Sequence, residues 1–331
     1  MTTALIDGDI IAFRAAAKVQ DMFDGEAVAD PRVAIREADH LIEQWTKYIK
    51  PNLTYICLSC PSRVYFRHDI YPEYKANRKE LQRPPALSDV INHLREKYKC
   101  LVHTGLEADD VMGYYGTSPD LHNPVIVSID KDMMTVPTKV LNPDKMRRPI
   151  RINKGQADLL MFKQAITGDS TDNYKGIPGI GTVKADKILS NSMQNGIWNS
   201  VLQAFLDNKL TTEYALTMVR LARILRYEDY DVETGEIYLW HPVSREKMIP
   251  SSARNTTNSE MESKSSTSSK LYAEDSPETK PSISEMSSST SADTETKKTD
   301  TRRRTTSRKR SGTSTEQENE LKKKETEDAD T

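Results

Sequence analysis

Cysteine is scarce in this chain, with three residues among 331. Three cysteines cannot build a disulfide framework, so a protein of a reducing cytoplasm is expected. The sequence has no apolar run of about 18 residues, which excludes an ordinary transmembrane helix. The N-terminal segment has no basic region, and Asp7 and Asp9 interrupt its apolar stretch, which excludes a secretory signal. We therefore expect no membrane among its partners.

Two common chemical signatures are also missing. Cys57 and Cys60 have CxxC spacing, but Cys100 has no neighbouring cysteine and the six histidines are scattered, so no complete zinc set is visible. A GxxxxGK(S/T) loop is absent, which leaves ATP-driven work without support. The net charge of −2 shows no overall basic excess. Any affinity for nucleic acid must therefore come from local motifs.

The composition changes sharply near residue 250. Residues 251–331 contain 33 Ser or Thr out of 81 residues, and Tyr272 is their single aromatic residue. Such a segment cannot bury enough apolar surface to offset its ordering entropy, so we predict a disordered tail. Arg302–Arg304 and Arg308–Arg310 form a basic cluster within it. This cluster is either a solvated charge run or a weak, non-specific contact for nucleic acid.

Strand-like and helix-like segments alternate over the first 153 residues. Val125–Ile129 is an apolar run with β-branched residues, interrupted only by Ser128, and is typical of a buried parallel strand. Alternation of this kind predicts an α/β fold with a mostly parallel sheet flanked by helices. From about Lys154 the pattern turns mostly helical, which indicates a smaller helical module. Strands are expected at residues 4–6, 53–58, 101–103 and 125–129, and helices at 10–17, 31–49, 88–98 and from 107 onwards.

Acidic residues follow these expected strands. Because the C-terminal ends of parallel strands meet at one edge of a sheet, we expect these acids to converge there. Taken singly, each acid is explained equally well as a helix N-cap, a first-turn residue or a turn residue. Two further acids lie in the motif GDSTDN, which the helical module would deliver. The acids are Asp7, then Glu107, Asp109 and Asp110, then Asp130 and Asp132, and finally Asp169 and Asp172.

Eight converging carboxylates would repel one another strongly unless cations were present. Hard oxygen ligands suit Mg²⁺, with Mn²⁺ as an alternative. Two such ions about 3.5–4 Å apart are a common apparatus for in-line cleavage of phosphodiesters. The pattern therefore predicts a metal-dependent phosphodiesterase that holds two divalent ions.

Two further motifs suit contact with nucleic acid. The segment Tyr71–Lys79 combines aromatic residues with three cations, and Arg83 follows it. It is either a solvated loop or a phosphate-gripping segment in which Tyr74 stacks on a base. The motif GIPGIG at Gly176–Gly181 lies between two expected helices, followed by Lys184. Its glycines permit close approach of the backbone, whose N–H groups can hold a phosphate.

At this point the chain resembles the flap endonuclease/5′–3′ exonuclease superfamily, and specifically the small replicative exonucleases of tailed phages. The resemblance covers nearly all of residues 1–242 with the motifs in order. The matching segments are LIDGD (5–9), YPEYKANR (71–78), GLEADDVMG (105–113), SIDKD (128–132), GDSTDNYKGIPGIG (168–181), ARILR (222–226) and EIYLWHP (236–242).

The resemblance implies a PIN-like nuclease domain over residues 1–153 and a DNA-binding helix–hairpin–helix domain over residues 154–250, before the tail at 251–331. It assigns Lys75 and Arg78 to the scissile phosphate, and the 176–181 hairpin to the duplex, with a K⁺ ion as a possible aid. It assigns Asp7, Glu107, Asp109 and Asp110 to a first metal ion, and Asp130, Asp132, Asp169 and Asp172 to a second. The DNA-binding residues it suggests are Tyr74, Lys79, Arg83, Gly176, Gly179, Gly181 and Lys184.

The chain departs from the family in two places. Relatives usually carry an Asp after the second strand, whereas Ser59 or Cys60 stands there, and Asp69 lies at the wrong offset to replace it. The segment between Arg78 and Lys99 is short, which suits trimming of duplex 5′ ends better than threading of long flaps.

These features predict a monomeric 5′→3′ exonuclease acting on double-stranded DNA and RNA–DNA hybrids in the cytoplasm of an infected host. Its setting would be phage DNA replication, with primer removal, host DNA degradation and recombination as the roles that the resemblance suggests. A flap-specific endonuclease, a PIN-like ribonuclease and a catalytically silent DNA-structure-binding protein are the alternatives. Duplex DNA is favoured over free RNA by the hairpin motif.

Overall fold

A computed structural model describes residues 1–23, 26–78, 82–190 and 196–243, which belong to one compact unit. The predicted tail at 251–331, its basic cluster and Lys79 lie outside these described residues. In the described part, no helix is long and apolar enough to cross a membrane.

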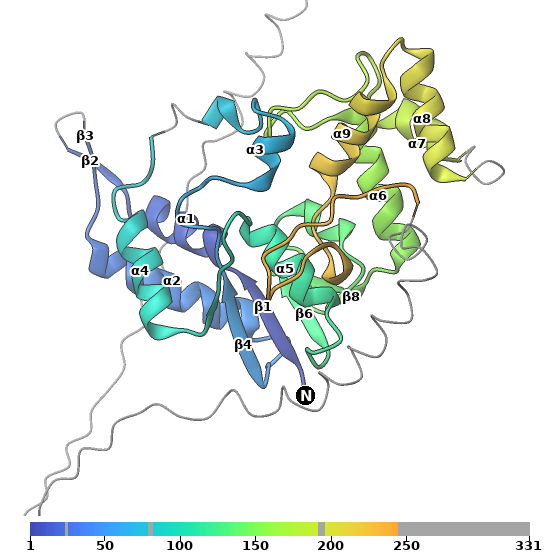
Figure 1. Ribbon diagram of the computed structural model, residues 1–331. Coiled ribbons are helices and arrows are strands. Elements are labelled where there is room, and N and C mark those ends of the chain that lie inside the picture. The colour runs from blue at the N-terminus through green and yellow to red at the C-terminus, as the bar shows by residue number, and fades with distance from the viewer. Residues whose placement is uncertain (24–25, 79–81, 191–195, 244–331) are drawn as a thin grey trace, which may run out of the picture. The chain divides into compact units, whose positions relative to one another are not determined.

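The centre of the fold is a six-stranded sheet in the order β5-β4-β1-β6-β7-β8. The first five strands in this order run parallel, and β8 is antiparallel to β7. This arrangement confirms the predicted mostly parallel α/β fold (Figure 1). The three-residue β7 and the two-residue β8 were not predicted from the sequence. The strands are β1 (Thr3–Asp7), β4 (Leu53–Cys57), β5 (Cys100–Leu101), β6 (Pro124–Val127), β7 (Lys139–Leu141) and β8 (Ile150–Arg151).

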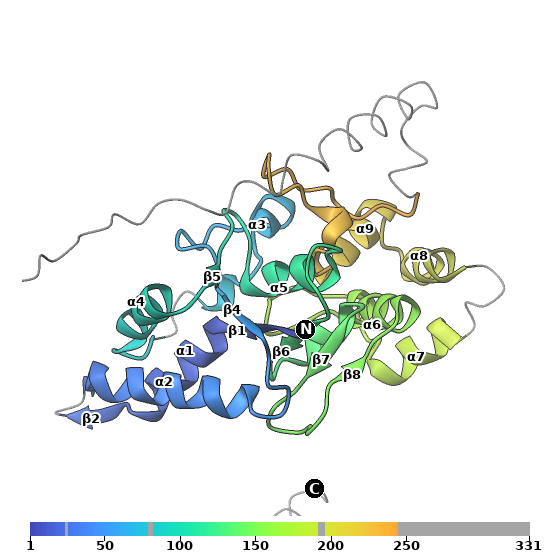
Figure 2. The same ribbon diagram turned by 90° about the horizontal axis from the view of Figure 1, so that it is seen from below.

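Helices cover both faces of the sheet. Three helices, α1 (Gly8–Lys18), α2 (Pro31–Thr46) and α4 (Leu87–Lys97), pack together on one face, and α5 (Ala108–Thr117) packs on β1 and β6 from the other. The two layers are visible in the view from below (Figure 2). The hairpin of β2 (Asp21–Phe23) and β3 (Glu26–Val28) forms a separate two-stranded sheet.

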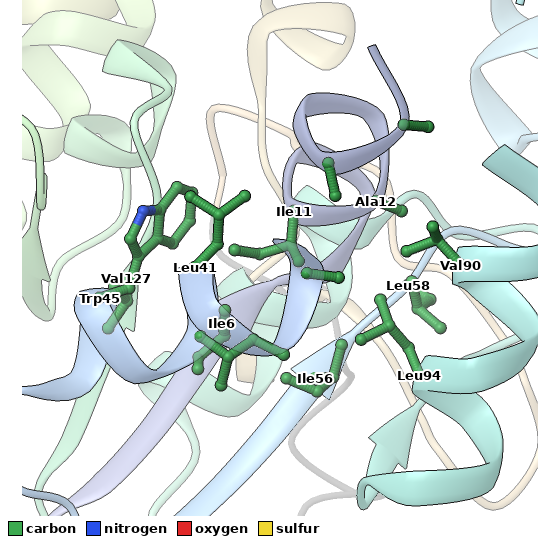
Figure 3. Close-up of a cluster of buried hydrophobic side chains, with 14 of the residues drawn as sticks. Ile6, Ile11, Ala12, Leu41, Trp45, Ile56, Leu58, Val90, Leu94 and Val127 are labelled. Carbon is green, nitrogen blue, oxygen red and sulfur yellow. The ribbon is translucent and has the colours of Figure 1, made fainter. Parts of the chain in front are cut away.

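The strands are buried on both faces because alternate side chains serve two apolar clusters. Ala4 and Ile6 pack with α1, α2 and α4, whereas Leu5 packs with α5. Figure 3 shows the first cluster, in which Ile6 of β1 and Ile56 of β4 lie beneath Ile11 of α1. Burial of each such side chain is worth about 1.5–3 kcal/mol. This core fixes the strand ends and therefore the positions of the residues that follow them.

Four helices follow the sheet: α6 (Lys154–Thr167), α7 (Thr182–Ser190), α8 (Ile197–Asp207) and α9 (Thr212–Ala222). They share an apolar cluster of their own, which also includes Tyr74. The predicted helical region from Lys154 is therefore confirmed, while the domain boundary at 153/154 stays a prediction. Shorter helices complete the fold: α3 (Phe66–Ile70), η1 (Ala76–Arg78), η2 (Lys131–Thr135) and η4 (Tyr227–Asp229).

Candidate metal centre

The ends of β1 and β6 place two of the predicted acids side by side. Asp7 is the last residue of β1 and the N-cap of α1, where its Oδ1 accepts the Ile10 N–H at 3.0 Å. The Ser128 hydroxyl, just beyond β6, donates to Oδ2 of Asp7 at 2.7 Å. Asp130 caps η2 by accepting the Asp132 N–H at 2.8 Å. Asp7 and Asp130 therefore act as helix N-caps, and both carboxylates lie at the same edge of the sheet.

A cavity of about 240 Å³ lies at this edge. Seven of the eight predicted acids line it, together with Asp9, Lys75 and Arg78. The structure thus brings together side chains from three strand ends and from the loop after α6. The acids that line the cavity are Asp7, Asp9, Glu107, Asp109, Asp130, Asp132, Asp169 and Asp172.

Three carboxyls of the cavity, those of Asp7, Asp109 and Asp132, have raised pKa values. Burial, with the charges of Asp9 and Asp130 adding to it, raises the pKa of Asp7 to about 7. Burial and the charges of Asp7 and Asp130 raise the pKa of Asp109 well above its usual value. The pKa of Asp132 rises to about 6, mainly through burial. A cation entering this cavity would stabilise the ionised forms.

Cationic side chains flank the other side of the same cavity. The Lys75 ammonium contacts Glu107 and lies 3.6 Å from Oδ1 of Asp172, which also accepts from Arg78 at 2.6 Å. Burial opposes ionisation of Glu107, but Lys75 and Arg67 outweigh it and lower the pKa of this carboxyl. Burial likewise opposes the charge on Lys75, but Glu107 and Asp172 raise its pKa overall. Lys75 is therefore a protonated cation and not a general base.

Asp110 is the acid that the structure does not bring to the cavity. It is fully buried, and Arg67 forks onto both of its oxygens, at 2.6 and 2.8 Å. The Leu225 N–H also donates to Oδ1 at 3.1 Å. With both oxygens engaged inside the protein, Asp110 does not match its predicted role as a metal ligand. Arg67 was missed because its segment carries no strand or helix pattern that would place it beside α5.

Tyr74 also differs from its prediction. Its side chain is 3% exposed, so it cannot stack on a base of a bound strand. Its hydroxyl instead lies within hydrogen-bond distance of Glu107 (2.9 Å) and Asp172 (3.0 Å). Arg83 is exposed as expected, and it lines a second cavity of about 790 Å³ that shares Lys75, Arg78 and Glu107 with the acidic one. The larger cavity also has Arg14, Arg63 and Arg95 in its wall.

The glycine motif divides into a packing part and an open part. Gly176 is buried, and a Cβ added there would lie 2.1 Å from the Ile166 carbonyl oxygen, so close packing and not ligand contact explains this glycine. Gly179, with a φ of +72°, and Gly181 are exposed and have no atom near a built Cβ. Lys184 donates to the Gly179 carbonyl at 3.0 Å. The open part thus offers backbone to a ligand, whereas Gly176 does not.

The donor chemistry of the acidic cavity fits a hydrated divalent cation. In the described residues, no three acidic, His or Cys side chains are already gathered as a closed ligand group. The carboxylates instead surround space for several water molecules of about 30 Å³ each, and Mg²⁺ typically keeps several waters when it binds. The buried Tyr174 hydroxyl has no hydrogen-bond partner in the described part, and the charges of Asp169 and Asp172 add to burial in raising its pKa.

Comparison with known proteins shows what the chain resembles. Residues 2–157 match the family model described as 5′-3′ exonuclease, N-terminal resolvase-like domain. The chain is 29% identical over 223 residues to an exodeoxyribonuclease of Enterobacteria phage T3, covering 57% of this chain and 74% of the relative. An exonuclease of Escherichia phage T7 is 28% identical over 221 residues, with 56% of this chain and 74% of the relative covered.

A solved structure of the T5 5′-exonuclease with bound zinc ions has a similar fold. Its TM-score is 0.52 at 20% identity, over 67% of this chain and 89% of that structure. The fold, the acid-lined sheet edge and the sequence relatives point the same way. The protein is a hydrolytic nuclease similar to the phage exonucleases, and its residues 2–157 match the N-terminal resolvase-like domain of 5′-3′ exonucleases.

Proposed function

We propose that this protein removes nucleotides from the 5′ ends of double-stranded DNA and of RNA–DNA hybrids, as a monomer, by metal-dependent hydrolysis of phosphodiester bonds. The observation that carries the proposal is the meeting of two surfaces. Eight carboxylates line one cavity, and the adjoining larger cavity has several arginines in its wall. The first surface suits divalent cations and the second suits the phosphates of a nucleic-acid strand.

Two Mg²⁺ ions, or Mn²⁺ in their place, are the proposed cofactors. When bound, such ions supply hydroxide at neutral pH and stabilise charge on the phosphate and the leaving oxygen. Asp7, Glu107 and Asp109 would hold one ion, whereas Asp110 would support this group from behind through Arg67. Asp130, Asp132, Asp169 and Asp172 would hold the other ion.

The cations of the cavity wall would bind the substrate. Lys75 and Arg78 line both cavities, so a phosphate bridging the two would meet them. Because the pKa of Lys75 is raised, its charge persists at neutral pH and stabilises negative charge on the reacting phosphate. Both side chains are paired with Glu107 or Asp172 before substrate arrives, which keeps them in place.

The exposed Gly179–Gly181 turn is the proposed second contact with the duplex. Its open backbone at the start of α7, with Lys184 in the first turns, suits a phosphate of the uncut part of the strand. A K⁺ ion between turn and phosphate is part of this proposal. Digestion of primers and of host DNA during phage replication is the biological setting that we infer from the phage relatives.

The test uses a blunt duplex labelled at one 5′ end, a matched duplex with a 5′ flap, and a duplex whose labelled strand begins with RNA. Each is incubated with Mg²⁺ or EDTA, with the wild type, Asp169→Asn or the control Asp186→Asn, an exposed residue on α7. We expect Mg²⁺-dependent release of labelled nucleotides from the blunt and hybrid ends by the wild type and the control, and loss of release in Asp169→Asn.

Three other outcomes would redirect the proposal. Cleavage confined to the flap junction would make the protein a flap-specific endonuclease, which the large basic cavity also suits. Binding of all three duplexes without cleavage would make it a silent DNA-binding protein. Wild-type turnover by Asp169→Asn would overturn the metal-based mechanism.

A further inference from the structure

The end of β4 lacks an acid, although β4 lies between β5 and β1 in the sheet. Asp7 ends β1, Asp130 closely follows β6, and Glu107 and Asp109 follow β5. After β4 the chain continues with Leu58, Ser59 and Cys60. The position directly after β4, at the acidic edge of the sheet, therefore has no carboxylate.

Asp9 reaches this place from α1. Gly8 allows the approach, because a Cβ on this residue would lie 2.5 Å from Cγ2 of Ile56 and 2.8 Å from the Cys57 carbonyl oxygen. The start of α1 consequently rests directly on the end of β4. From there, Oδ1 of Asp9 accepts the Ser59 N–H at 3.2 Å. The Asp9 carboxylate is therefore hydrogen-bonded to the segment directly after β4, which has no carboxylate.

Ser59 links Asp9 to neighbouring segments. Its hydroxyl oxygen accepts the Ala108 N–H at 2.9 Å, and its side chain also hydrogen-bonds with Asp9 and with Tyr65. Asp9 is thereby connected to β4 and, through Ser59, to the start of α5, which carries Asp109. It lines both cavities, with Lys75 and Glu107 as shared neighbours. The Ser59 N–H occupies one lone pair of Oδ1, and a carboxylate has further lone pairs for the cavity.

We propose that Asp9 is a further metal-binding carboxylate, which takes the place of a strand-end acid on β4 and helps to hold a hydrated divalent cation. This inference rests on the proposed function of the cavity. Under this proposal, the Asp9 carboxylate interacts with a bound cation and does not serve only as a helix cap. The sequence feature behind it is the pair Asp7 and Asp9 on either side of a glycine that must be small.

Binding of Mn²⁺ by the metal-free full-length chain tests the proposal without relying on activity. Free Mn²⁺ is followed by electron paramagnetic resonance for the wild type, Asp9→Asn and the control Asp89→Asn, an exposed acid in the first turn of α4. We expect Asp9→Asn to bind Mn²⁺ at least about 10-fold more weakly at one site, the size of effect known for groups around metals. The control should match the wild type.

Thermal melting in EDTA distinguishes a metal-binding role of Asp9 from a structural one. The side-chain amide oxygen of Asp9→Asn still accepts the Ser59 N–H, so a metal-binding role predicts a melting temperature equal to or above that of the wild type. A structural role predicts a lower melting temperature. A second variant, Asp9→Asn with Ser59→Asp, returns a carboxylate to the end of β4 and should recover most of the lost Mn²⁺ affinity.

The outcomes separate this inference from the proposed function. Equal Mn²⁺ binding by the wild type and Asp9→Asn would overturn the role of Asp9 alone. A lower melting temperature in EDTA with unchanged Mn²⁺ binding would overturn it in favour of a purely structural residue. Failure of the wild type itself to bind Mn²⁺ would overturn the proposed metal site, and the role of Asp9 with it.

Discussion

Asp109 and Asp110 are neighbours in the chain but belong to opposite kinds of site. Asp110 points into the protein, where Arg67 and the Leu225 N–H engage both of its oxygens. Asp109 lines the acidic cavity, where Asp7 and Asp130 repel it. Successive residues on a helix are about 100° apart, so one turn of α5 serves both environments.

The difference teaches what distinguishes a structural carboxylate from one that awaits a ligand. Inside this fold, a buried acid with a bidentate arginine has its charge compensated by the protein. The half-buried Asp109 has acidic neighbours that the charge of Lys75 offsets only in part, and its pKa is raised as a result. The apolar clusters on both faces of the sheet provide the stability that lets the fold tolerate this partly compensated group.

The largest effect is expected for Asp109→Asn. Loss of this carboxylate should reduce nuclease activity on the order of 10³-fold, or about 4 kcal/mol in the barrier. The melting temperature in EDTA should stay level or rise, because the variant removes a carboxylate that Asp7 and Asp130 repel. Release of a 5′ label and thermal melting measure the two effects. Activity within about 10-fold of the wild type would place Asp109 outside the metal site.

Asp110→Asn should produce the reverse pattern. Removing one partner of a buried ion pair leaves Arg67 poorly compensated, at a cost of about 3 kcal/mol. For a folded unit of this size, that corresponds to a drop of roughly 10 °C in melting temperature. Mn²⁺ affinity should change much less than in Asp109→Asn. A variant that melts like the wild type but loses Mn²⁺ would restore Asp110 to the metal ligands.

The pH dependence of stability should differ between the metal-free and metal-bound protein. The pKa values of Asp7, about 7, and Asp132, about 6, lie above those of an unfolded Asp, about 3.9, so the folded state binds more protons between them. The stability they contribute is complete below about pH 4 and is lost as the pH rises through 6 to 7. Glu107, whose pKa is lowered, acts below this window.

In EDTA, ionisation of these acids should therefore lower the melting temperature by roughly 5 °C between pH 5.5 and pH 8. His103 has a pKa lowered by burial and contributes with the opposite sign, so comparison with Asp7→Asn isolates the contribution of Asp7. Saturating Mg²⁺ should remove the contribution, because it adds stability where the carboxylates are ionised. A wild type that gains stability from pH 5.5 to 8 relative to Asp7→Asn would contradict the raised pKa values.

Sequence reasoning predicted the site residues whose positions depend only on neighbouring residues in the chain. Strand-end acids such as Asp7 and Asp130 could be predicted because an apolar strand and the residue after it are visible in the chain. The opposite directions of Asp109 and Asp110 could not, because they depend on Arg67, which reaches α5 from a different segment. Asp9 was treated only as a break in an apolar run, since its position depends on how closely Gly8 lets α1 approach β4.

The burial of Tyr74 was also not predictable from the sequence. Its cationic neighbours in sequence suggested an exposed stacking residue, whereas packing against the α6–α9 helices buries it. The fold class was predictable because burial of whole strands leaves a periodic pattern. The burial of one aromatic residue in a charged segment leaves none.

The smallest expected effect belongs to Tyr74→Phe, because the Tyr74 hydroxyl contacts two carboxylates of the cavity that already have cationic partners. The Tyr74 hydroxyl reaches Glu107, which is paired with Arg67, and Asp172, which lines the acidic cavity beside Arg78. Because both acids keep a cationic partner in the variant, the loss should be about 1 kcal/mol, or about 3 °C in melting temperature. Activity should fall only a few-fold, through less exact placement of Asp172.

Tyr71→Phe is the matched control, since its hydroxyl donates to the exposed Glu73 and its removal should change neither quantity. Label release and thermal melting again provide the measurements. If Tyr74→Phe lost activity as deeply as Asp109→Asn, the paired and unpaired carboxylates would form one coupled network. A small effect instead means that the cationic partners of Glu107 and Asp172, and not the Tyr74 hydroxyl, hold these two carboxylates in place.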